Sequence, residues 1–539
     1  MNSLNLNFFK LGVFASCFTI ASNAKAESNS KSKPSKPNIL FCIADDASFA
    51  HFGAKGCKWA STPAVDYLAA NGINFVNAYT PNAKSAPSRA CLLTGRNSWQ
   101  LEEVGNHLAI WPNDKFLTYV EALSRNNYQV GSTGKGWAPG SPGTLNGNAR
   151  ELAGKEFNTR FLVPPTKAMG RDDYAANFKD FLDQKSSNEP WCFWFGCREP
   201  HREYIYGSGQ KLGGKKLSDI DKVPLFWPDN DTVRNDMLDY AFEIEHFDKQ
   251  LDKMIKMLTD KGELENTIIV VTSDNGMPFP RSKGLLYEYS NHMPLVVMWL
   301  NGIKNKGRVE KEYVSFVDIA PTFIQLAGLK WSDTGMEPAA GKSLQDIFYD
   351  KKKTDRSYIL LGQERHDAGR PTNQGYPIRS IIKDGFLYNY NFKPELWPAG
   401  NPETGYLNTD GSPTKTNILN LRRAGIDKSY WNLCFAKHEQ EELFQINVDK
   451  ECLVNVADKP EFEKIKSELK KVLFDDLIKQ KDPRVLGNGS VFDNYPLFQP
   501  LYQNFYERYM QGDKNLRTQT NWVNFDDYET ESTQPVEVK

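Results

Sequence analysis

Two pairs of acidic and amide side chains follow short apolar runs that the sequence predicts to be buried strands. Asp45 and Asp46 come directly after the first run, and Asp274 and Asn275 close a second one. Adjacent carboxylates repel each other unless a positive charge lies between them, and hard divalent cations prefer such oxygen ligands. A helix N-cap with a charged neighbour is the alternative for one pair alone. Because ligands gather at the carboxyl ends of strands in an open parallel sheet, the two pairs together favour a metal site, with calcium before magnesium.

A third chemical signal is the string SAPSRACLLTG, which runs from Ser85 to Gly95. Its composition predicts a loop that opens into a helix, and a proline-bearing N-cap accounts for Pro87 and Ser88 but not for the whole string. A serine hydroxyl is a weak nucleophile unless a base, a metal or a chemical modification activates it. Ser85 is therefore the candidate nucleophile if the string carries chemistry.

SxPSRxxLLTG resembles the signature of the type I sulfatases of the alkaline phosphatase superfamily. The resemblance extends over about residues 38–475 and continues in PNILFCIADD, Gly134-Lys135, Pro200-His201, TSDNG, Lys283-Gly284, SFVDIAPTFIQLAG and EELFQINVDKECLVNVAD. The string SDNGMPFPRSKGLLYE is similar to the sulfamidase-like branch, which includes heparan N-sulfatases and, by resemblance, enzymes acting on algal polysaccharides such as ulvan. The family fold is a large, mostly parallel sheet between helices, with a smaller C-terminal α+β domain.

The resemblance implies a role for each matching residue. A separate maturation enzyme would oxidise Ser85 to formylglycine (3-oxoalanine), whose hydrated form offers one hydroxyl for attack at sulfur and a second for release of sulfate. His201 is the candidate for protonating the leaving sugar oxygen. The groups expected around the sulfate are Arg89, Lys135, His201 and Lys283. The expected Ca²⁺ ligands are Asp45, Asp46, Ser85, Asp274 and Asn275.

The chain departs from the family pattern after Lys135. Many relatives carry a histidine two residues after this lysine, whereas here Gly136 and Trp137 follow it. His107 or His292 is a candidate to compensate, and a structural role in a loop or core stays open for both.

The spacing of apolar residues predicts how the chain positions these groups. Nearly continuous apolar runs at residues 38–44, 268–271 and 295–299 predict buried parallel strands, and helical periodicity at 117–126 and 240–258 predicts the helices between them. Strands alternating with helices indicate an α/β sandwich. Alternating runs at 378–382 and 386–390 and a helix at 460–479 predict a second domain. The expected parts are a catalytic domain (38–375), a C-terminal α+β subdomain (376–486) and an unassigned extension (487–539).

The first residues are typical of a signal peptide. Lys10 precedes an apolar run over residues 11–21, and Ala24-Lys25-Ala26 offers a cleavage site, so the mature chain is expected to start at Glu27 with a polar linker up to residue 37. A lipid anchor at Cys17 is the less favoured alternative. The signal peptide places the protein in the periplasm or outside the cell. With 66 basic and 67 acidic side chains, nothing favours nucleic acid as a partner, and no later segment is apolar enough for a membrane span.

Seven cysteines remain after the expected cleavage, which is an odd and sparse set for so long a chain. One or two disulfides are the most that this set predicts, and no pair has the CxxC spacing of a zinc or redox site.

The charged segment Gln363–Arg370 is the candidate for sugar recognition. Its side chains Glu364, Arg365, His366 and Asp367 are suited to paired hydrogen bonds with sugar hydroxyls, and a solvated charged turn is the alternative. Four aromatic residues are candidates to stack on sugar rings or, individually, to belong to the core: Trp59, Trp111, Trp137 and Tyr287.

The favoured function is hydrolysis of sulfate esters on a polysaccharide fragment, with ulvan as the favoured polymer. A heparan-type N-sulfoglucosamine sulfohydrolase is the first alternative. A metal-dependent phosphotransferase or phosphodiesterase that uses unmodified Ser85 is a second, although two-metal sites of that kind generally need several histidines and the seven here are scattered. A sulfated-glycan binding protein without catalysis is a third.

Overall fold

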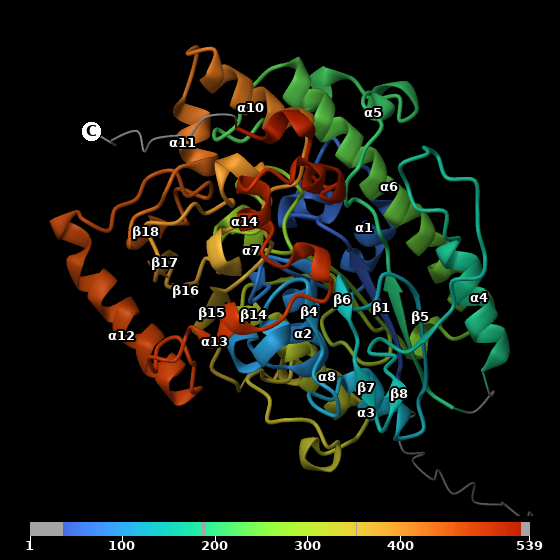
Figure 1. Ribbon diagram of the computed structural model, residues 1–539. Helices are drawn as coiled ribbons and strands as arrows, with labels where there is room; N and C mark the ends of the chain where they lie inside the picture. Colours follow the sequence, from blue (N-terminus) through green and yellow to red (C-terminus); the bar gives the residue numbers. More distant parts are fainter. Residues whose placement is uncertain (1–35, 186–188, 352, 530–539) are drawn as a thin grey trace, which may run out of the picture. The chain divides into compact units, whose positions relative to one another are not determined.

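The computed structural model describes residues 36–185, 189–351 and 353–529. The expected signal peptide and almost all of the expected linker lie outside the described residues. The described residues form an eight-stranded sheet at the centre of Figure 1. From edge to edge its strands are β13 (Arg308–Glu310), β2 (Ile73–Phe75), β12 (Leu295–Met298), β11 (Thr267–Ser273), β1 (Asn38–Ala44), β10 (Trp191–Gly196), β5 (Gln129–Gly134) and β9 (Lys155–Glu156).

The middle of this sheet is parallel, as predicted. β1 pairs with β11 on one side and with β10 on the other, and β10 pairs with β5. The expectation that the run at 295–299 is also parallel is wrong, because β12 pairs antiparallel with both β11 and β2. A continuous apolar run indicates that both faces of a strand are buried, but it does not indicate the direction of the strand in the sheet. Between β11 and β12 the chain forms only the short helix α7 (Glu288–Asn291), which does not cross over a sheet face.

Side chains of β1 alternate between two apolar layers. Leu40 and Cys42 pack into the layer with helices α1 (Pro63–Ala70), α4 (Tyr174–Gln184) and α6 (Asp231–Asp260). Ile39 and Phe41 pack into the layer with α2 (Ser85–Thr94), α3 (Tyr119–Ser124) and α8 (Ile319–Leu326). Helices therefore cover both faces of the sheet, which confirms the predicted α/β sandwich.

A second, antiparallel sheet has the order β15 (Tyr358–Gln363), β16 (Ile378–Lys383), β17 (Phe386–Asn391) and β18 (Glu441–Gln445). β16 and β17 form a hairpin whose turn residues Asp384 and Gly385 both have positive φ, the conformation that Asp-Gly turns favour. Helix α12 (Glu463–Lys479) packs on this sheet through leucines four residues apart. The first strand of this sheet, β15, consists of residues that were expected to belong to the large catalytic domain.

The chain after residue 487 folds into short helices that lie against the rest of the protein. They include α13 (Val491–Asn494) and α14 (Phe505–Met510), drawn in red in Figure 1. Phe505 and Leu516 pack with Ala368 and Leu407 in one apolar cluster. The extension is thus part of the fold at least as far as residue 529.

The seven cysteines after Cys17 are all free thiols. No helix within the described ranges is both long and apolar enough to cross a membrane.

Candidate active site

The candidate site lies at the carboxyl ends of four neighbouring strands. Asp45 and Asp46 follow β1, Asp274 follows β11, Lys135 follows β5, and His201 comes after β10. Because these strands are parallel neighbours, their carboxyl ends meet at one edge of the sheet. Lys283 and Asp46, which are 237 residues apart in the sequence, are brought into hydrogen-bond contact there.

Three buried carboxylates form the centre of the site. Asp45, Asp46 and Asp274 each offer an oxygen, and these oxygens lie within 4.8 Å of one another. Asp46 takes a left-handed backbone conformation with φ of 72°, and its amide donates to Asp274 Oδ1 at 3.0 Å. The side-chain Nδ2 of Asn275 donates to Asp46 Oδ1 at 2.6 Å. The two pairs recognised in the sequence therefore converge.

Ser85 is the first residue of helix α2. Its hydroxyl lies 3.2 Å from Asp45 Oδ1, 3.4 Å from Asn275 Oδ1 and 3.1 Å from Lys135 Nζ. The helix is held in place by Ser88, whose hydroxyl donates to the Asp274 carbonyl oxygen at 2.6 Å. The candidate nucleophile is thus fixed against the carboxylate centre.

Arg89 lies behind the carboxylates and does not line the cavity. Its guanidinium donates to Asp274 at 2.8 Å, to Asp45 at 3.2 Å and to the Lys135 carbonyl oxygen at 2.8 Å, and its side chain is fully buried. Arg89 donates four hydrogen bonds to protein acceptors, so it positions the acidic residues, and the expectation that it surrounds the sulfate stays a prediction.

Two lysines bring positive charge to the cavity wall. Lys135 Nζ lies 2.6 Å from Asp45 Oδ2, and Lys283 Nζ lies 2.6 Å from Asp46 Oδ2 and 2.7 Å from Asp410 Oδ2. Burial alone raises the pKa of Asp45, but Lys135 and Arg89 outweigh it and hold this pKa well below its usual value. Burial lowers the pKa of Lys283, but its two carboxylate partners raise it overall. Asp45 is therefore a carboxylate and Lys283 a cation.

The donor set fits a divalent cation. Asp45, Asp46, Asp274 and Asp410 carry four negative charges against three positive charges on Arg89, Lys135 and Lys283, which leaves one net negative charge in a buried place. A divalent ion would change this to one net positive charge, which matches the single negative charge of a sulfate monoester. All candidate ligand atoms are oxygens, which hard cations such as Ca²⁺ prefer.

His201 faces the same centre. Its Nδ1 lies 2.7 Å from the Arg202 carbonyl oxygen, and its Nε2 lies 3.8 Å from Asp46 Oδ2. A carbonyl oxygen only accepts, so Nδ1 carries a proton, which leaves Nε2 as the ring nitrogen that faces the carboxylates. The imidazole is partly exposed to the cavity and can transfer a proton there.

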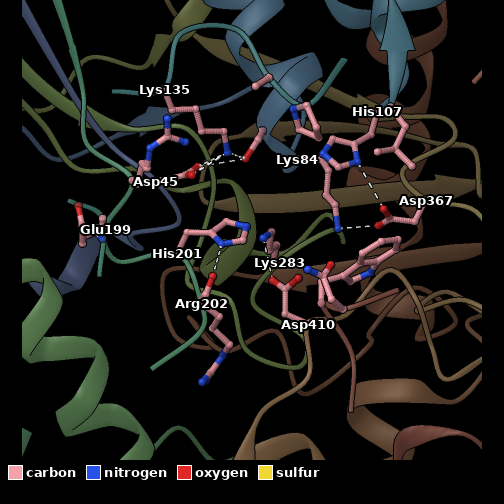
Figure 2. A pocket seen from close by; sticks show the side chains of 18 of the residues that line it. Asp45, Lys84, His107, Lys135, Glu199, His201, Arg202, Lys283, Asp367 and Asp410 are labelled. Atoms are coloured by element: carbon pink, nitrogen blue, oxygen red, sulfur yellow. Dashed lines mark hydrogen bonds and ion pairs between the residues drawn. The ribbon is translucent and has the colours of Figure 1, made fainter. Parts of the chain in front are cut away.

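A cavity of about 520 Å³ opens over this centre, with Ser85, Lys135, His201 and Lys283 in its wall. In Figure 2, Lys135 reaches toward Asp45, while Lys84 and His107 both point at Asp367. The cavity wall also holds six charged residues that the sequence analysis did not assign: Lys84, Arg198, Glu199, Arg202, Glu243 and Asp410. Lys84 and Arg202 are sequence neighbours of the predicted site residues Ser85 and His201, so the sequence could have indicated them. No motif near Asp410 indicates a role in the site.

Three of the four predicted sugar-binding residues do not reach the cavity. Glu364 pairs with Arg379 at 2.7 Å and with Arg484, and the His366 ring bonds to Asn82 at 2.8 Å. Arg365 donates to carbonyl oxygens of residues 493–496. These side chains are almost fully buried, and the hydrogen bonds named above all go to protein partners. Asp367 alone lines the cavity.

Of the remaining candidates from the sequence, one histidine lines the cavity and the others are buried in the protein. His107 lines the cavity and lies 3.4 Å from Asp367, whereas His292 is buried between Phe49 and Tyr79. The four aromatic candidates belong to the core and do not line the cavity: Trp59, Trp111, Trp137 and Tyr287. Trp137 supports helix α2, because its indole donates to the Ala86 carbonyl oxygen at 2.9 Å.

Comparison with known families gives a match over residues 37–329 to the model described as Sulfatase. The chain belongs to the sulfatase family. A second model, described as N-sulphoglucosamine sulphohydrolase, C-terminal, matches residues 281–382 of this sulfatase. These matches cover the carboxylate centre, the cavity lysines and the first strands of the smaller sheet.

Curated relatives of this sulfatase span most of its length. An ulvan-active sulfatase from Formosa agariphila is 26% identical over 522 residues, covering 87% of this chain and 82% of the relative. The human N-sulphoglucosamine sulphohydrolase is 25% identical over 512 residues, covering 86% and 95%. The protein is therefore a sulfuric ester hydrolase. This activity disfavours the alternatives of a phosphotransferase and of a binding protein without catalysis.

Solved structures share the fold. A protein in complex with its substrate D-glucosamine-2-N,6-O-disulfate superposes with a TM-score of 0.58 at 20% identity, covering 83% of this chain and 98% of that one. A protein in complex with a neocarrahexaose gives 0.58 at 19% identity, covering 90% and 99%.

Proposed function

We propose that this sulfatase removes O-sulfate groups from fragments of a sulfated polysaccharide, with Ser85 oxidised to formylglycine and Ca²⁺ as cofactor. The observation that carries the proposal is the place of Ser85 Oγ, in contact with Asp45, Asn275 and Lys135 at the wall of the cavity. A hydrated aldehyde at this position supplies a stronger nucleophile than a serine hydroxyl. A separate maturation enzyme would carry out the oxidation.

The metal would be held by five oxygen donors and would act as a Lewis acid on the sulfuryl group. These donors belong to Asp45, Asp46, Ser85, Asp274 and Asn275. Arg89 keeps two of the carboxylates in place from behind.

The remaining cavity residues would bind the substrate and move a proton. Lys135 and Lys283 donate to the sulfuryl oxygens, where negative charge grows in the transition state. His201 is anchored through Nδ1, so Nε2 is the atom that protonates the leaving sugar oxygen.

The proposed substrate is a fragment of ulvan, with its sulfated rhamnose, in preference to N-sulfoglucosamine. Two ulvan-active sulfatases, at 26% and 27% identity, support the first choice, and the human sulfohydrolase at 25% supports the alternative. Ser at position 85, where other members carry Cys, resembles bacterial sulfatases. The expected signal peptide supports a place in the periplasm or outside the cell.

The test is a desulfation assay on ulvan oligosaccharides and on N-sulfoglucosamine, combined with peptide mass analysis of the active protein. We expect sulfate release from ulvan fragments and a peptide containing residue 85 that is lighter by two hydrogens. Full activity with unmodified Ser85 would refute the formylglycine mechanism. Release from N-sulfoglucosamine but not from ulvan would overturn the choice of substrate.

A further inference from the structure

The C-terminal extension brings a row of aromatic side chains to the cavity. Phe498, Tyr502 and Trp522 all line it. The ring centroids of Phe498 and Tyr502 are 6.3 Å apart, and those of Tyr502 and Trp522 are 5.7 Å apart. All three rings are half-buried, so each keeps part of its surface open. We call these three residues the aromatic wall.

The aromatic wall is held in place by distant parts of the chain. The Trp522 indole donates to the Leu407 carbonyl oxygen at 2.9 Å, and the Gly411 amide donates to the Trp522 carbonyl oxygen at 2.7 Å. The Phe498 amide donates to the Leu108 carbonyl oxygen at 2.9 Å. Because the polar edge of the indole already has its partner, the apolar ring faces are what the wall offers to a ligand.

Polar groups of the same cavity lie close to this wall. Asp367 pairs with Lys84 at 2.7 Å and lies 3.4 Å from the His107 ring, as seen in Figure 2. Asp367 and Tyr502 line the same cavity, and burial together with the negative charge of Asp367 raises the pKa of Tyr502. Lys84 and Asp367 cancel each other's charge, so this side of the cavity favours hydroxyl groups over a second anion.

A sugar ring has apolar C–H faces and a rim of hydroxyl groups. Rings of this kind need a flat apolar surface next to hydrogen-bonding side chains. Neighbouring rings of the aromatic wall are inclined by 51° and 74°, so the open face of one ring supplies the apolar surface. Asp367 and His107 supply the hydrogen bonds. The sulfate centre around Ser85 is made of other residues, so the cavity has two chemically distinct parts.

We infer that the aromatic wall binds a pyranose ring of the oligosaccharide substrate next to the sulfated sugar, and that Asp367 and His107 bind the hydroxyls of that ring. The inference rests on the proposed function in taking this cavity as the substrate site. It makes the C-terminal extension a determinant of substrate length, separate from sulfate chemistry.

The test compares Trp522→Ala and Tyr502→Ala with the wild type on rhamnose sulfate and on an ulvan tetrasaccharide. Losing one buried aromatic contact corresponds to roughly a 10- to 100-fold change. We therefore expect the ratio of kcat/KM for tetrasaccharide over monosaccharide to fall by roughly that factor. Phe525→Ala is the matched control, because Phe525 is an aromatic residue of the same extension, 57% exposed and away from the cavity. Its ratio should stay at the wild-type value.

A binding measurement separates this inference from the proposed function. Calorimetry on the Ser85→Ala protein, with an ulvan and a heparin-derived tetrasaccharide as probes, needs no turnover. We expect Trp522→Ala in that background to raise Kd by roughly 10- to 100-fold for the tetrasaccharide that binds. An unchanged ratio and Kd, equal losses on both substrates, or no binding of either probe would overturn the inference. Absence of sulfate release by the wild type, with binding still dependent on Trp522, would instead refute the proposed function.

Discussion

Arg365 is expected to control sugar recognition without touching the sugar. Its guanidinium donates to the carbonyl oxygens of Asp493, Tyr495 and Pro496 at 3.3, 2.8 and 3.4 Å. These residues directly precede Phe498, the first residue of the aromatic wall. Replacing Arg365 with Ala removes three of the hydrogen bonds that tie this segment to the loop after β15, while the bond from the Gly375 amide to Asp493 stays.

The size of the effect follows from the burial of the guanidinium. Burial lowers the pKa of Arg365 to about 10, although the nearby Asp493 carboxylate partly offsets this effect. Hydrogen bonds to a charged donor contribute about 1.5–3 kcal/mol each, and one of the three is short. Because that range already includes the cost of desolvation, the short bond to the Tyr495 carbonyl oxygen alone contributes about 2 kcal/mol. Because unpaired carbonyl groups are costly to bury, we expect the segment to open to water rather than to stay in place.

The assay is a double-mutant cycle with Arg365→Ala and Trp522→Ala, using rhamnose sulfate and the ulvan tetrasaccharide. Arg365→Ala should lower the ratio of kcat/KM for tetrasaccharide over monosaccharide nearly as far as Trp522→Ala does, by roughly 10-fold or more. In the double variant this ratio should fall little further than in either single variant. Urea unfolding of each variant reports the loss of global stability. Independent, multiplying losses from the two substitutions would refute the reasoning, as would an Arg365→Ala protein with an intact ratio.

Two further predictions concern the metal and acid stability. Asp274→Ala should abolish sulfate release, and EDTA should do the same with recovery on adding Ca²⁺; full recovery with Zn²⁺ alone would contradict the oxygen-ligand assignment. Burial lowers the pKa of His51 to about 3, so the unfolded chain takes up this proton first as pH falls below about 6.5. The free energy of unfolding should therefore be lower by about 1.4 kcal/mol at pH 5.5 than at pH 7.5. In the His51→Gln variant, which keeps a hydrogen-bond partner for Tyr240, urea unfolding should show a smaller decrease over the same pH range. An equal decrease of the unfolding free energy in the wild type and in His51→Gln would contradict the assignment of this pH dependence to His51.

The elements that the sequence predicted well are those with strong local patterns. The run at β1 and the helical period of α6 depend only on neighbouring residues. β1 forms where expected, and α6 contains the predicted helix at 240–258 but begins earlier, at Asp231. The direction of β12 was missed, because pairing with β11 and β2 is decided by the path of the connecting chain.

The charged segment after β15 shows why some site residues could not be predicted. Its composition fits a polar turn or a sugar site, but Glu364 finds Arg379 and Arg484, the latter 120 residues further along the chain. Whether a charged side chain is exposed depends on such distant partners, which composition does not reveal.

The sequence by itself determined the chemistry of the centre. Acidic residues at the ends of β1 and β11, and Ser85 at the start of α2, are local features, and parallel strands bring such ends together in any fold of this class. Only the tertiary structure decided the shape of the rest of the cavity. The aromatic wall depends on Trp522 reaching Leu407, 115 residues away, and such contacts form only when the whole chain has folded. The carboxylate centre with Ser85 can therefore be predicted from sequence motifs, whereas the aromatic wall is found only in the folded protein.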